Sequence, residues 1–338
     1  MSEREISNRP LTIGVVGTMV WDRIHARDVR AAPIEEWGGI SYALAGVSAA
    51  AQPAWVVRPL IRVGSDLSER AFHFFRSIPG LDTLRGVQVI PEPNNRVELR
   101  YIDRERRTER LTGGVGPWTW AELEPLVADL DALYINFISG FELELETAQR
   151  LRLSFRGPIY ADLHSLMLGV DVTGMRVPRP LEAWREWLRC FDIVQVNEEE
   201  LTLLAQAWGD PWRFAAEMVN DELRLLLVTL GPRGTVYFSS PSFRKDPLSW
   251  RTGTELVIRP AIAGGGPVKS ERIPPPDAPA GGDPTGCGDV WGGTFFCKLL
   301  AGHTLNSSIR SANTAAARNV EHHGATGLRE HLLGKLAT

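Results

Sequence analysis

Short apolar runs alternate with longer amphipathic segments along most of the chain. The runs are rich in Val, Ile and Leu, as parallel strands are when helices cover both faces of their sheet. These predicted strands cover residues 11–17, 54–64, 132–138, 158–163, 192–196 and 223–231. Helical periodicity predicts helices over residues 41–51, 68–78, 119–130, 145–155, 181–190, 198–208 and 211–221. The alternation predicts an α/β fold with a doubly wound, mainly parallel sheet flanked by helices.

Two segments alternate apolar and polar residues instead. Residues 95–111 do so around a charged turn, which predicts a β-hairpin with one exposed face, and residues 23–39 have a similar two-stranded pattern. We expect these segments, about 23–39 and 94–112, to form a small β-sheet lid over the carboxyl ends of the main strands. Residues 240–282 are rich in Pro, Gly and Ser and predict a loop insertion with edge strands in a single domain, residues 1–338.

The composition is that of an ordinary globular protein and argues against several classes of function. The 338 residues carry a net charge of -4, which is not the basic character of a protein that binds nucleic acid or an anionic membrane. The three cysteines have no metal-binding spacing, and no apolar run reaches the ~18 residues that a membrane helix needs. Because the first residues are polar, we expect no signal peptide and a cytoplasmic protein.

The sequence DPTGCGD, residues 283–289, places a glycine-rich turn directly before an apolar, helix-compatible run. Such a turn leaves backbone N–H groups unpaired at a helix N-terminus, where the helix dipole also attracts anions. Asp289 would repel a phosphate, unless a neutral hydroxyl lies between the two groups. The carboxylate then takes the hydroxyl proton while the amides of Gly286, Cys287 and Gly288 stabilise the phosphoryl group. The pattern predicts a phosphotransfer site; the alternative is that Asp289 only caps the helix.

The same stretch resembles the second signature of the ribokinase (PfkB) family of carbohydrate kinases, in which an Asp–x–Thr–Gly–x–Gly–Asp run supplies an anion hole and the catalytic base. Cys287 stands where the family usually has alanine. Further resemblances follow in family order on predicted strand ends. They are Asp22 with the paired Gly38 and Gly39 for the acceptor, the VGxD element at 62–66, Asn197 and Glu200 for magnesium and phosphate, and Thr229, Gly231 and Gly234 for the nucleotide phosphates.

The resemblance implies an ATP-dependent kinase that phosphorylates a hydroxymethyl group of a sugar or related polyol. Asp289 would be its base, and Glu200 would order water bound to Mg²⁺. In relatives, oxygens at the positions of Asp283 and Thr285 often bind a monovalent cation, so activation by K⁺ is an expectation to test. The partner would be a small sugar or nucleoside substrate rather than nucleic acid or a membrane, and a homodimer could form through exposed lid strands.

The sequence departs from the family where the acceptor should bind. Ile40 and Ala43 stand where many sugar kinases have a lysine and an asparagine, which argues against a phosphosugar and against a ribokinase proper. Trp21, Trp37 and Tyr42 crowd the same region, where they either stack on a nucleobase or sugar ring or pack in the core or lid. The identity of the acceptor therefore stays open.

Other functions fit parts of the sequence. A nucleoside kinase would share the whole machinery and differ in its acceptor. A non-catalytic regulator that binds a sugar or nucleoside would share the fold but would have no need of Asp289. A Rossmann-type dehydrogenase fits poorly, because GTMVWD after the first strand lacks the glycine fingerprint. His164, in the run Asp162-Leu163-His164, stands where the family often has asparagine and either reaches the phosphate or caps a loop.

Overall fold

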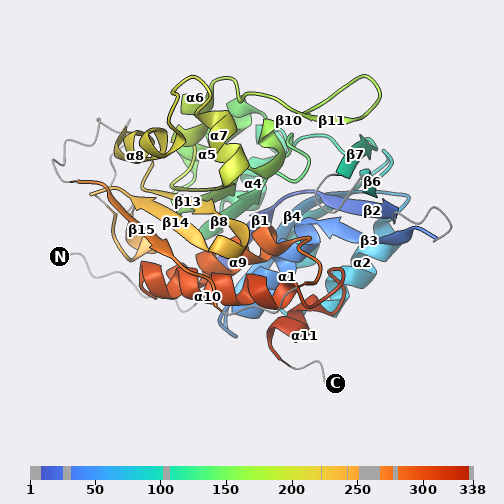
Figure 1. Cartoon of the computed structure of the whole chain (residues 1–338). Helices are drawn as coiled ribbons and strands as arrows, with labels where there is room; N and C mark the ends of the chain where they lie inside the picture. The colour runs from blue at the N-terminus through green and yellow to red at the C-terminus, as the bar shows by residue number, and fades with distance from the viewer. Residues whose placement is uncertain are drawn as a thin grey trace.

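A large sheet forms the centre of the molecule. The computed structural model describes residues 9–25, 32–101, 107–221, 223–241, 243–250, 267–276 and 281–334. The strands of this sheet are β1 (Thr12–Val16), β4 (Val56–Gly64), β5 (Val87–Ile90), β8 (Ala132–Asn136), β9 (Ile159–Asp162), β12 (Ile193–Asn197), β13 (Leu225–Thr229), β14 (Thr235–Ser239) and β15 (Lys269–Ile273). Their order is β15-β14-β13-β12-β9-β8-β1-β4-β5 (Figure 1).

Every pairing from β13 to β5 is parallel, and β14 and β15 close one edge as antiparallel strands. The predicted strands are confirmed, and they are buried because helices cover both faces. The strand order reverses at β1, since β4 lies on one side of it and β8 on the other. Ligands of open α/β sheets bind at such a switch point, beyond the carboxyl ends of the strands.

Two helical layers cover the sheet (Figure 1). One layer contains α1 (Ile40–Ala50), α2 (Ser68–Ser77), α9 (Cys287–Leu300), α10 (Leu305–Asn319) and α11 (Leu328–Leu332). The other layer contains α4 (Trp120–Val127), α5 (Leu145–Ser154), α6 (Trp184–Arg189), α7 (Glu198–Leu204) and α8 (Pro211–Asp221). The connections also contain four short helical turns, α3 (Thr83–Gly86), η1 (His164–Met167), η2 (Gly231–Arg233) and η3 (Pro247–Ser249). No helix in the described ranges is long and apolar enough to cross a membrane.

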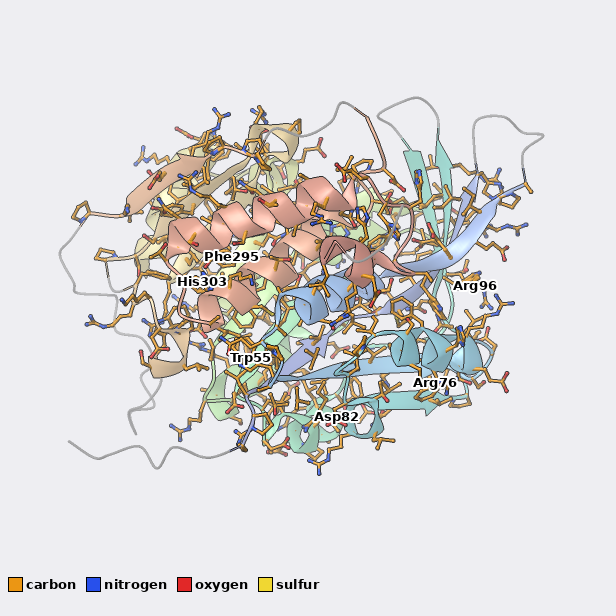
Figure 2. All side chains as sticks on the ribbon, turned by 90° about the horizontal axis from the view of Figure 1, so that it is seen from below. Trp55, Arg76, Asp82, Arg96, Phe295 and His303 are labelled. Carbon is orange, nitrogen blue, oxygen red and sulfur yellow. The ribbon has the colours of Figure 1, made fainter. Side chains whose placement is uncertain are left out.

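The helix α9 lies between α1 and α10, and Figure 2 marks it by Phe295. Glycines allow α1 and α9 to approach closely. A Cβ added to Gly46 would lie 3.0 Å from the Cα of Val290, and one added to Gly293 would lie 2.8 Å from a methyl group of Val47. This packing fixes the start of α9, where the DPTGCGD stretch ends, against the carboxyl edge of the sheet.

The two alternating segments form a separate four-stranded sheet, as predicted. Its strands are β2 (Met19–His25), β3 (Ile34–Gly39), β6 (Arg96–Tyr101) and β7 (Arg107–Thr112), in the order β3-β2-β6-β7. Both hairpins are antiparallel, and β2 pairs with β6 in parallel. The first strand begins at Met19, four residues before the predicted segment, because the chain passes from β1 into the small sheet almost without a loop. The role of this sheet as a lid stays a prediction.

Two further features concern the connections. A hairpin of β10 (Leu168–Val170) and β11 (Arg176–Pro178), absent from the sequence predictions, follows η1 and packs its turn on β7, where the Leu111 amide donates to the Gly174 carbonyl at 2.8 Å. The predicted insertion at 240–282 contains η3 and the edge strand β15. Residues 251–266 and 277–280 of that segment, including its glycine triplet, lie outside the described residues.

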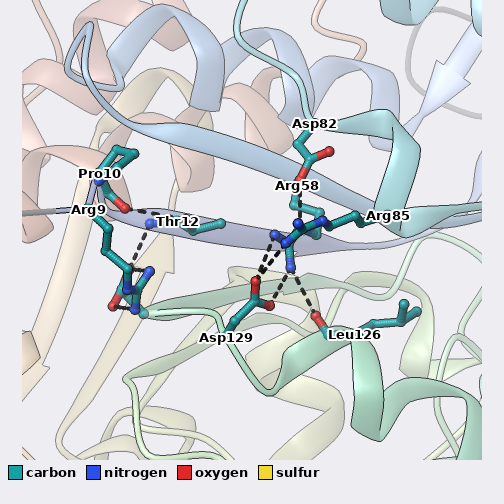
Figure 3. A network of polar contacts seen from close by, with 9 residues as sticks. Arg9, Pro10, Thr12, Arg58, Asp82, Arg85, Leu126 and Asp129 are labelled. Carbon is teal, nitrogen blue, oxygen red and sulfur yellow. Dashed lines mark hydrogen bonds and ion pairs between the residues drawn. The ribbon is translucent and has the colours of Figure 1, made fainter. Parts of the chain in front are cut away.

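An ion-pair network holds the amino ends of the central strands (Figure 3). Arg58 at the start of β4 has a side chain only 5% exposed and donates to Asp82 at 3.0 Å and to Asp129 at 2.6 Å. Asp131 accepts from the Thr12 amide at 2.8 Å. Breaking a buried pair leaves an uncompensated charge, so this network stabilises the end of the sheet opposite the one where ligands bind.

Candidate active site

Polar side chains form a row across the carboxyl ends of three neighbouring strands. Asn136 of β8 is in register with Asp162 of β9, which is in register with Gln195 of β12. Gln195 donates to Asp162 at 2.8 Å and to the Gly288 carbonyl at 3.1 Å. The row therefore lies directly beneath the first turn of α9. Sequence reasoning missed Asn136 and Gln195, because each is a single polar residue inside an apolar strand.

Asn136 holds the carboxylate of Asp289. Its Nδ2 donates to Asp289 Oδ1 at 2.6 Å, and Asn136 itself is completely buried. The N-cap of α9 is Gly286, with φ of 76°, so Asp289 is the third helical residue rather than the cap. Its side chain is bound to the sheet. This geometry favours a role in chemistry over the capping alternative.

Two stacked tyrosine rings pack beside this polar row. The rings of Tyr134 and Tyr160 lie 5.0 Å apart, and the Tyr160 hydroxyl donates to Gln195. Gly292 gives them room, because a Cβ there would lie 2.6 Å from Gln195 Oε1 and 2.7 Å from the Tyr134 hydroxyl. Gly292, the first glycine of the pair that follows the signature, is thus needed for close packing of α9 on the polar row.

The titratable groups around Asp289 influence each other strongly. Burial raises the pKa of Asp289, Glu200 raises it too, and His164 and Asn136 lower it. Burial, with Glu200 next, raises the pKa of Asp162 well above its usual range. Burial opposes protonation of His164, but the carboxylates around it, Glu200 first, raise its pKa to about 9. At neutral pH the site therefore holds a protonated His164 beside the carboxyl groups of Asp162, Glu200 and Asp289.

Asp22 and the paired glycines form one unit on the acceptor side. Asp22 lies within β2, is 7% exposed, and has Glu36 of β3 as its cross-strand partner. A Cβ on Gly38 would lie 1.8 Å from Asp22 Oδ2, so only glycine leaves room for the carboxylate. Gly39, with φ of 59°, turns the chain into α1. The resemblance-based assignment of these three residues is consistent with this arrangement but is not tested by it.

Tyr42 connects the acceptor side with the start of α9. A Cβ on Gly286 would lie 2.1 Å from its ring, which shows how closely the ring covers that glycine. Burial raises the pKa of Tyr42, and the carboxylates of Asp22 and Asp289 are both near enough to add to the effect. Trp21 and Trp37 point to the opposite face of the small sheet and pack edge to face at 5.0 Å. These two rings are packing residues, whereas Tyr42 lies at the site.

The predicted donor residues lie together at the ends of β12 and β13. Asn197 and Thr229 are in register as the last residues of these strands. Asn197 and Glu200 form a capping box on α7, and Glu200 Oε1 lies 3.5 Å from His164 Nδ1. Glu200 therefore has a structural role as well as a place facing the site.

Tight turns follow β13. Gly231, with φ of 56°, begins η2, and Gly234, with φ of 89°, follows its last residue. A Cβ at Gly234 would lie 2.3 Å from the Ile273 carbonyl oxygen, which explains the need for glycine there. The turn is therefore a compact loop beside the strand ends, as the nucleotide-contact prediction requires.

The remaining signature residues are largely engaged with the backbone. Asp283 accepts from the Thr285 amide at 2.9 Å and lies 3.6 Å from His323, and the Thr285 carbonyl accepts from Asn319 at 2.8 Å. The Cys287 amide donates to the Pro284 carbonyl at 3.1 Å. The amides of Gly286 and Gly288 make no hydrogen bond to any residue within the described ranges. The predicted anion hole would therefore use the amides of these two glycines rather than that of Cys287.

Residues 83–331 match the sequence profile of the pfkB family carbohydrate kinases. The chain belongs to this family. The match begins after Asp22 and the glycine pair, so it supports the second signature and the donor motifs more directly than the acceptor motif. This pfkB-family chain is a phosphotransferase, which confirms that prediction. No curated protein sequence matches the chain.

Solved structures show the same fold. A ribokinase from Thermotoga maritima has 17% sequence identity and a TM-score of 0.69, and the alignment covers 96% of this chain and 99% of that one. Ribokinase from Arabidopsis thaliana, complexed with ribose and ATP, has 18% identity, coverage of 98% and 99%, and a TM-score of 0.66. The Burkholderia thailandensis nucleoside kinase, complexed with inosine, has 15% identity, coverage of 95% for both chains, and a TM-score of 0.64. The predicted ribokinase-like fold is confirmed.

Proposed function

We propose that this pfkB-family chain transfers the γ-phosphoryl group of ATP to a hydroxymethyl group of a small sugar or related polyol. The observation that carries the proposal is the Asp289 carboxylate, held at 2.6 Å by the buried Asn136 beside the amides of Gly286 and Gly288. A base and an anion hole at one helix start are what phosphoryl transfer to a neutral hydroxyl requires. A binding-only regulator would not need this combination.

In the proposed step, Asp289 accepts the proton of the acceptor hydroxyl. The hydroxyl oxygen forms its bond to phosphorus as the bond between the γ-phosphorus and the β–γ bridging oxygen breaks, so that ADP leaves with that electron pair. Asp22 orients the acceptor by accepting hydrogen bonds from its other hydroxyls. The amides of Gly286 and Gly288 stabilise charge on the equatorial oxygens. The small sheet would act as a lid that excludes water.

The donor side fits a nucleotide with its metal bound through water. The described residues contain no cluster of three or more His, Cys, Asp or Glu side chains that could hold a metal ion directly. Glu200 would instead face the water shell of Mg²⁺, which supplies charge neutralisation at the phosphates when bound. Thr229 and the loop from Gly231 to Gly234 would contact the nucleotide phosphates. ATP as donor is supported by the ATP and ADP complexes of structural relatives.

Two further parts of the proposal concern cations and assembly. Oxygens of Asp283 and Thr285 would bind K⁺. Asp283 Oδ1 and the Thr285 carbonyl each accept one hydrogen bond, and each oxygen keeps a second lone pair for a cation. We therefore expect K⁺ to increase the activity. A homodimer would form through the edge of the small sheet that β3 provides, because the β10–β11 turn is already paired with β7 at the other edge.

A sugar or polyol is favoured over a nucleoside as the acceptor. Trp21 and Trp37, the rings that could have stacked on a nucleobase, lie on the face opposite Asp22. A purified-protein panel of ribose, fructose, ketodeoxy sugar acids, adenosine, inosine and cytidine with ATP and Mg²⁺ tests the proposal. Turnover with a non-nucleoside acceptor above the background ATPase rate is expected. Turnover confined to nucleosides would favour the alternative kinase, and binding without turnover in the whole panel would favour a regulator.

A further inference from the structure

The face of the small sheet that carries Asp22 continues beyond the proposed acceptor site. Cross-strand partners place Glu36, Asp22, Val97 and Leu111 in one row over β3, β2, β6 and β7, with their side chains on the same face. Neighbouring strands are about 4.8 Å apart, so the row runs about 10 Å from Asp22 to Leu111. It begins with two carboxylates and ends in apolar residues.

A cavity of about 470 Å³ lies at the Leu111 end of this row. Its walls are Leu111 itself, the glycine-rich residues 112–116, Gly140 and Phe141 after β8, and β10. Gly140 follows four residues after Asn136, which holds Asp289, and the cavity residue Asn95 accepts from the Trp21 amide next to Asp22 at 3.0 Å. Two of the residues that line the cavity are therefore joined to the proposed active site by short backbone connections.

The wall formed by the β10–β11 hairpin is firmly attached. Asp171 accepts from the amides of Thr173 and Met175 and fixes the turn, and the turn is paired with β7. Arg176 donates to the carbonyls of Ile138 and Ser139 at 3.0 and 3.1 Å. This arginine is used to hold the hairpin against the loop after β8, and Glu109 and Glu142 lie near enough to favour its charge.

Arg179 has a different environment. It is the single charged residue among the described residues that line the cavity, and its side chain makes no ion pair or hydrogen bond to any part of the chain with a described position. Its amide donates to the Met167 carbonyl at 2.9 Å, and its Cδ lies 3.3 Å from where a Cβ of Gly169 would be. The backbone under the guanidinium is thus fixed, while its five N–H donors remain available to a ligand in the cavity.

We propose that this cavity is a distal part of the acceptor site and binds an anionic group of the substrate, a carboxylate or a phosphate ester, through Arg179. The expectation against a phosphosugar concerned the missing lysine at Ile40, which follows β3 at the opposite edge of the small sheet from β7, so Arg179 is a separate means of binding an anion. The inference rests on the proposed function. The two carboxylates at the other end of the row repel an anion, so the acceptor binds in one direction. Its hydroxymethyl end lies at Asp289, its hydroxyls at Asp22, and its acidic end at Arg179. The substrate class is then an acidic polyol, longer than a pentose.

Matched pairs of an acidic and a neutral acceptor test this proposal. D-Gluconate and D-glucitol differ at one end by a carboxylate against a hydroxymethyl group, and fructose 1-phosphate and fructose differ by a phosphate ester. With ATP and Mg²⁺, we expect kcat/KM for one acid to exceed that of its neutral partner by about 10- to 100-fold, the range that a hydrogen bond to a charged group gives. The pair that shows the preference distinguishes carboxylate from phosphate.

Variants of Arg179 assign the preference to this residue. In Arg179→Gln the ratio of kcat/KM for the acid to that for its neutral partner should fall by about 10- to 100-fold, and Arg179→Lys should keep part of the ratio because the charge remains. The control is Arg150→Gln on α5, which removes the same charge from an exposed surface pair and should leave the ratio unchanged. An unchanged ratio in Arg179→Gln would overturn the assignment.

The failures of the two proposals can be distinguished. Efficient phosphorylation of neutral acceptors, with no preference for either acid, would overturn the anion subsite but would support the proposed kinase activity. If no acceptor supports turnover, calorimetric titration with D-gluconate and fructose 1-phosphate decides. If Arg179→Gln weakens this binding at least tenfold, the anion subsite is supported although the proposed reaction has failed. If neither acid binds, the anion subsite is overturned.

Discussion

Removal of the Asn136 amide tests how the protein holds its proposed base. Asn136 Nδ2 donates to Asp289 Oδ1 at 2.6 Å, while Asn136 Oδ1 is buried and has no hydrogen-bond partner. Asn136→Leu keeps a similar volume and removes that unpaired acceptor, which offsets part of the folding stability lost with the hydrogen bond to Asp289. The same change leaves the Asp289 carboxylate without its closest donor in a site where burial already raises its pKa.

The size of the effect follows from the type of hydrogen bond. A bond to a charged group contributes about 1.5–3 kcal/mol, and one pKa unit corresponds to about 1.4 kcal/mol, so the pKa of Asp289 should rise by about one to two units. The base acts as a carboxylate, and activity is therefore lost below this pKa and recovered above it. The acid limb of the kcat/KM profile should move by about one to two pH units toward alkaline pH.

The assay is ADP release from about pH 5 to about pH 9 with the best acceptor of the panel. The groups that face Asp289, namely Asp162, His164 and Glu200, are present in both proteins, so the difference between the profiles reports Asn136. Tyr134→Phe is the control, because it removes a hydroxyl that lies 3.5 Å from both the Asp289 carbonyl and Asn136 Nδ2 and leaves the bond from Asn136 to the Asp289 carboxylate in place. A uniform loss of activity with an unmoved acid limb would refute the positioning role of Asn136.

Three further predictions follow from the same geometry. Glu200→Gln should keep the capping box on α7, since glutamine can replace glutamate there, but raise the Mg²⁺ concentration needed for half-maximal activity; an unchanged Mg²⁺ titration would remove Glu200 from the site. Asp22→Asn should lower kcat/KM for the acceptor about 10- to 100-fold with the KM for ATP unchanged, and an equal loss in ATP binding would make Asp22 structural. Gly38→Ala should have a similar effect, because its Cβ would lie 1.8 Å from Asp22 Oδ2, and a fully active variant would contradict the close approach.

The sequence predicted the main elements because each has a strong local pattern. The apolar runs became the parallel strands, and the alternating segments became the small sheet. The polar row under α9 was not predicted, because Asn136 and Gln195 each interrupt an apolar strand only once. Their shared face becomes visible only through the register of β8, β9 and β12. A search for polar residues near the carboxyl ends of predicted parallel strands could have found both.

The acceptor side shows where local patterns are insufficient. Trp21 and Trp37 are close to Asp22 in sequence, but alternation along β2 and β3 places them on the other face. The β10–β11 hairpin has only three residues in each strand and none of these residues is buried, so no hydrophobic pattern marked it. Arg179 could be related to the site only after that hairpin had been placed against β7.

The central claim is that Asp289 removes the proton of the acceptor hydroxyl, and Asp289→Asn tests it most directly. Asparagine keeps the size of the side chain and an oxygen that can accept from Asn136, but it cannot take up the proton. With the best acceptor, the rate of ADP release should fall about 10²- to 10⁴-fold, while calorimetry shows ATP binding and thermal unfolding close to those of the wild type. Near-normal turnover in Asp289→Asn would contradict the mechanism, whichever acceptor is used.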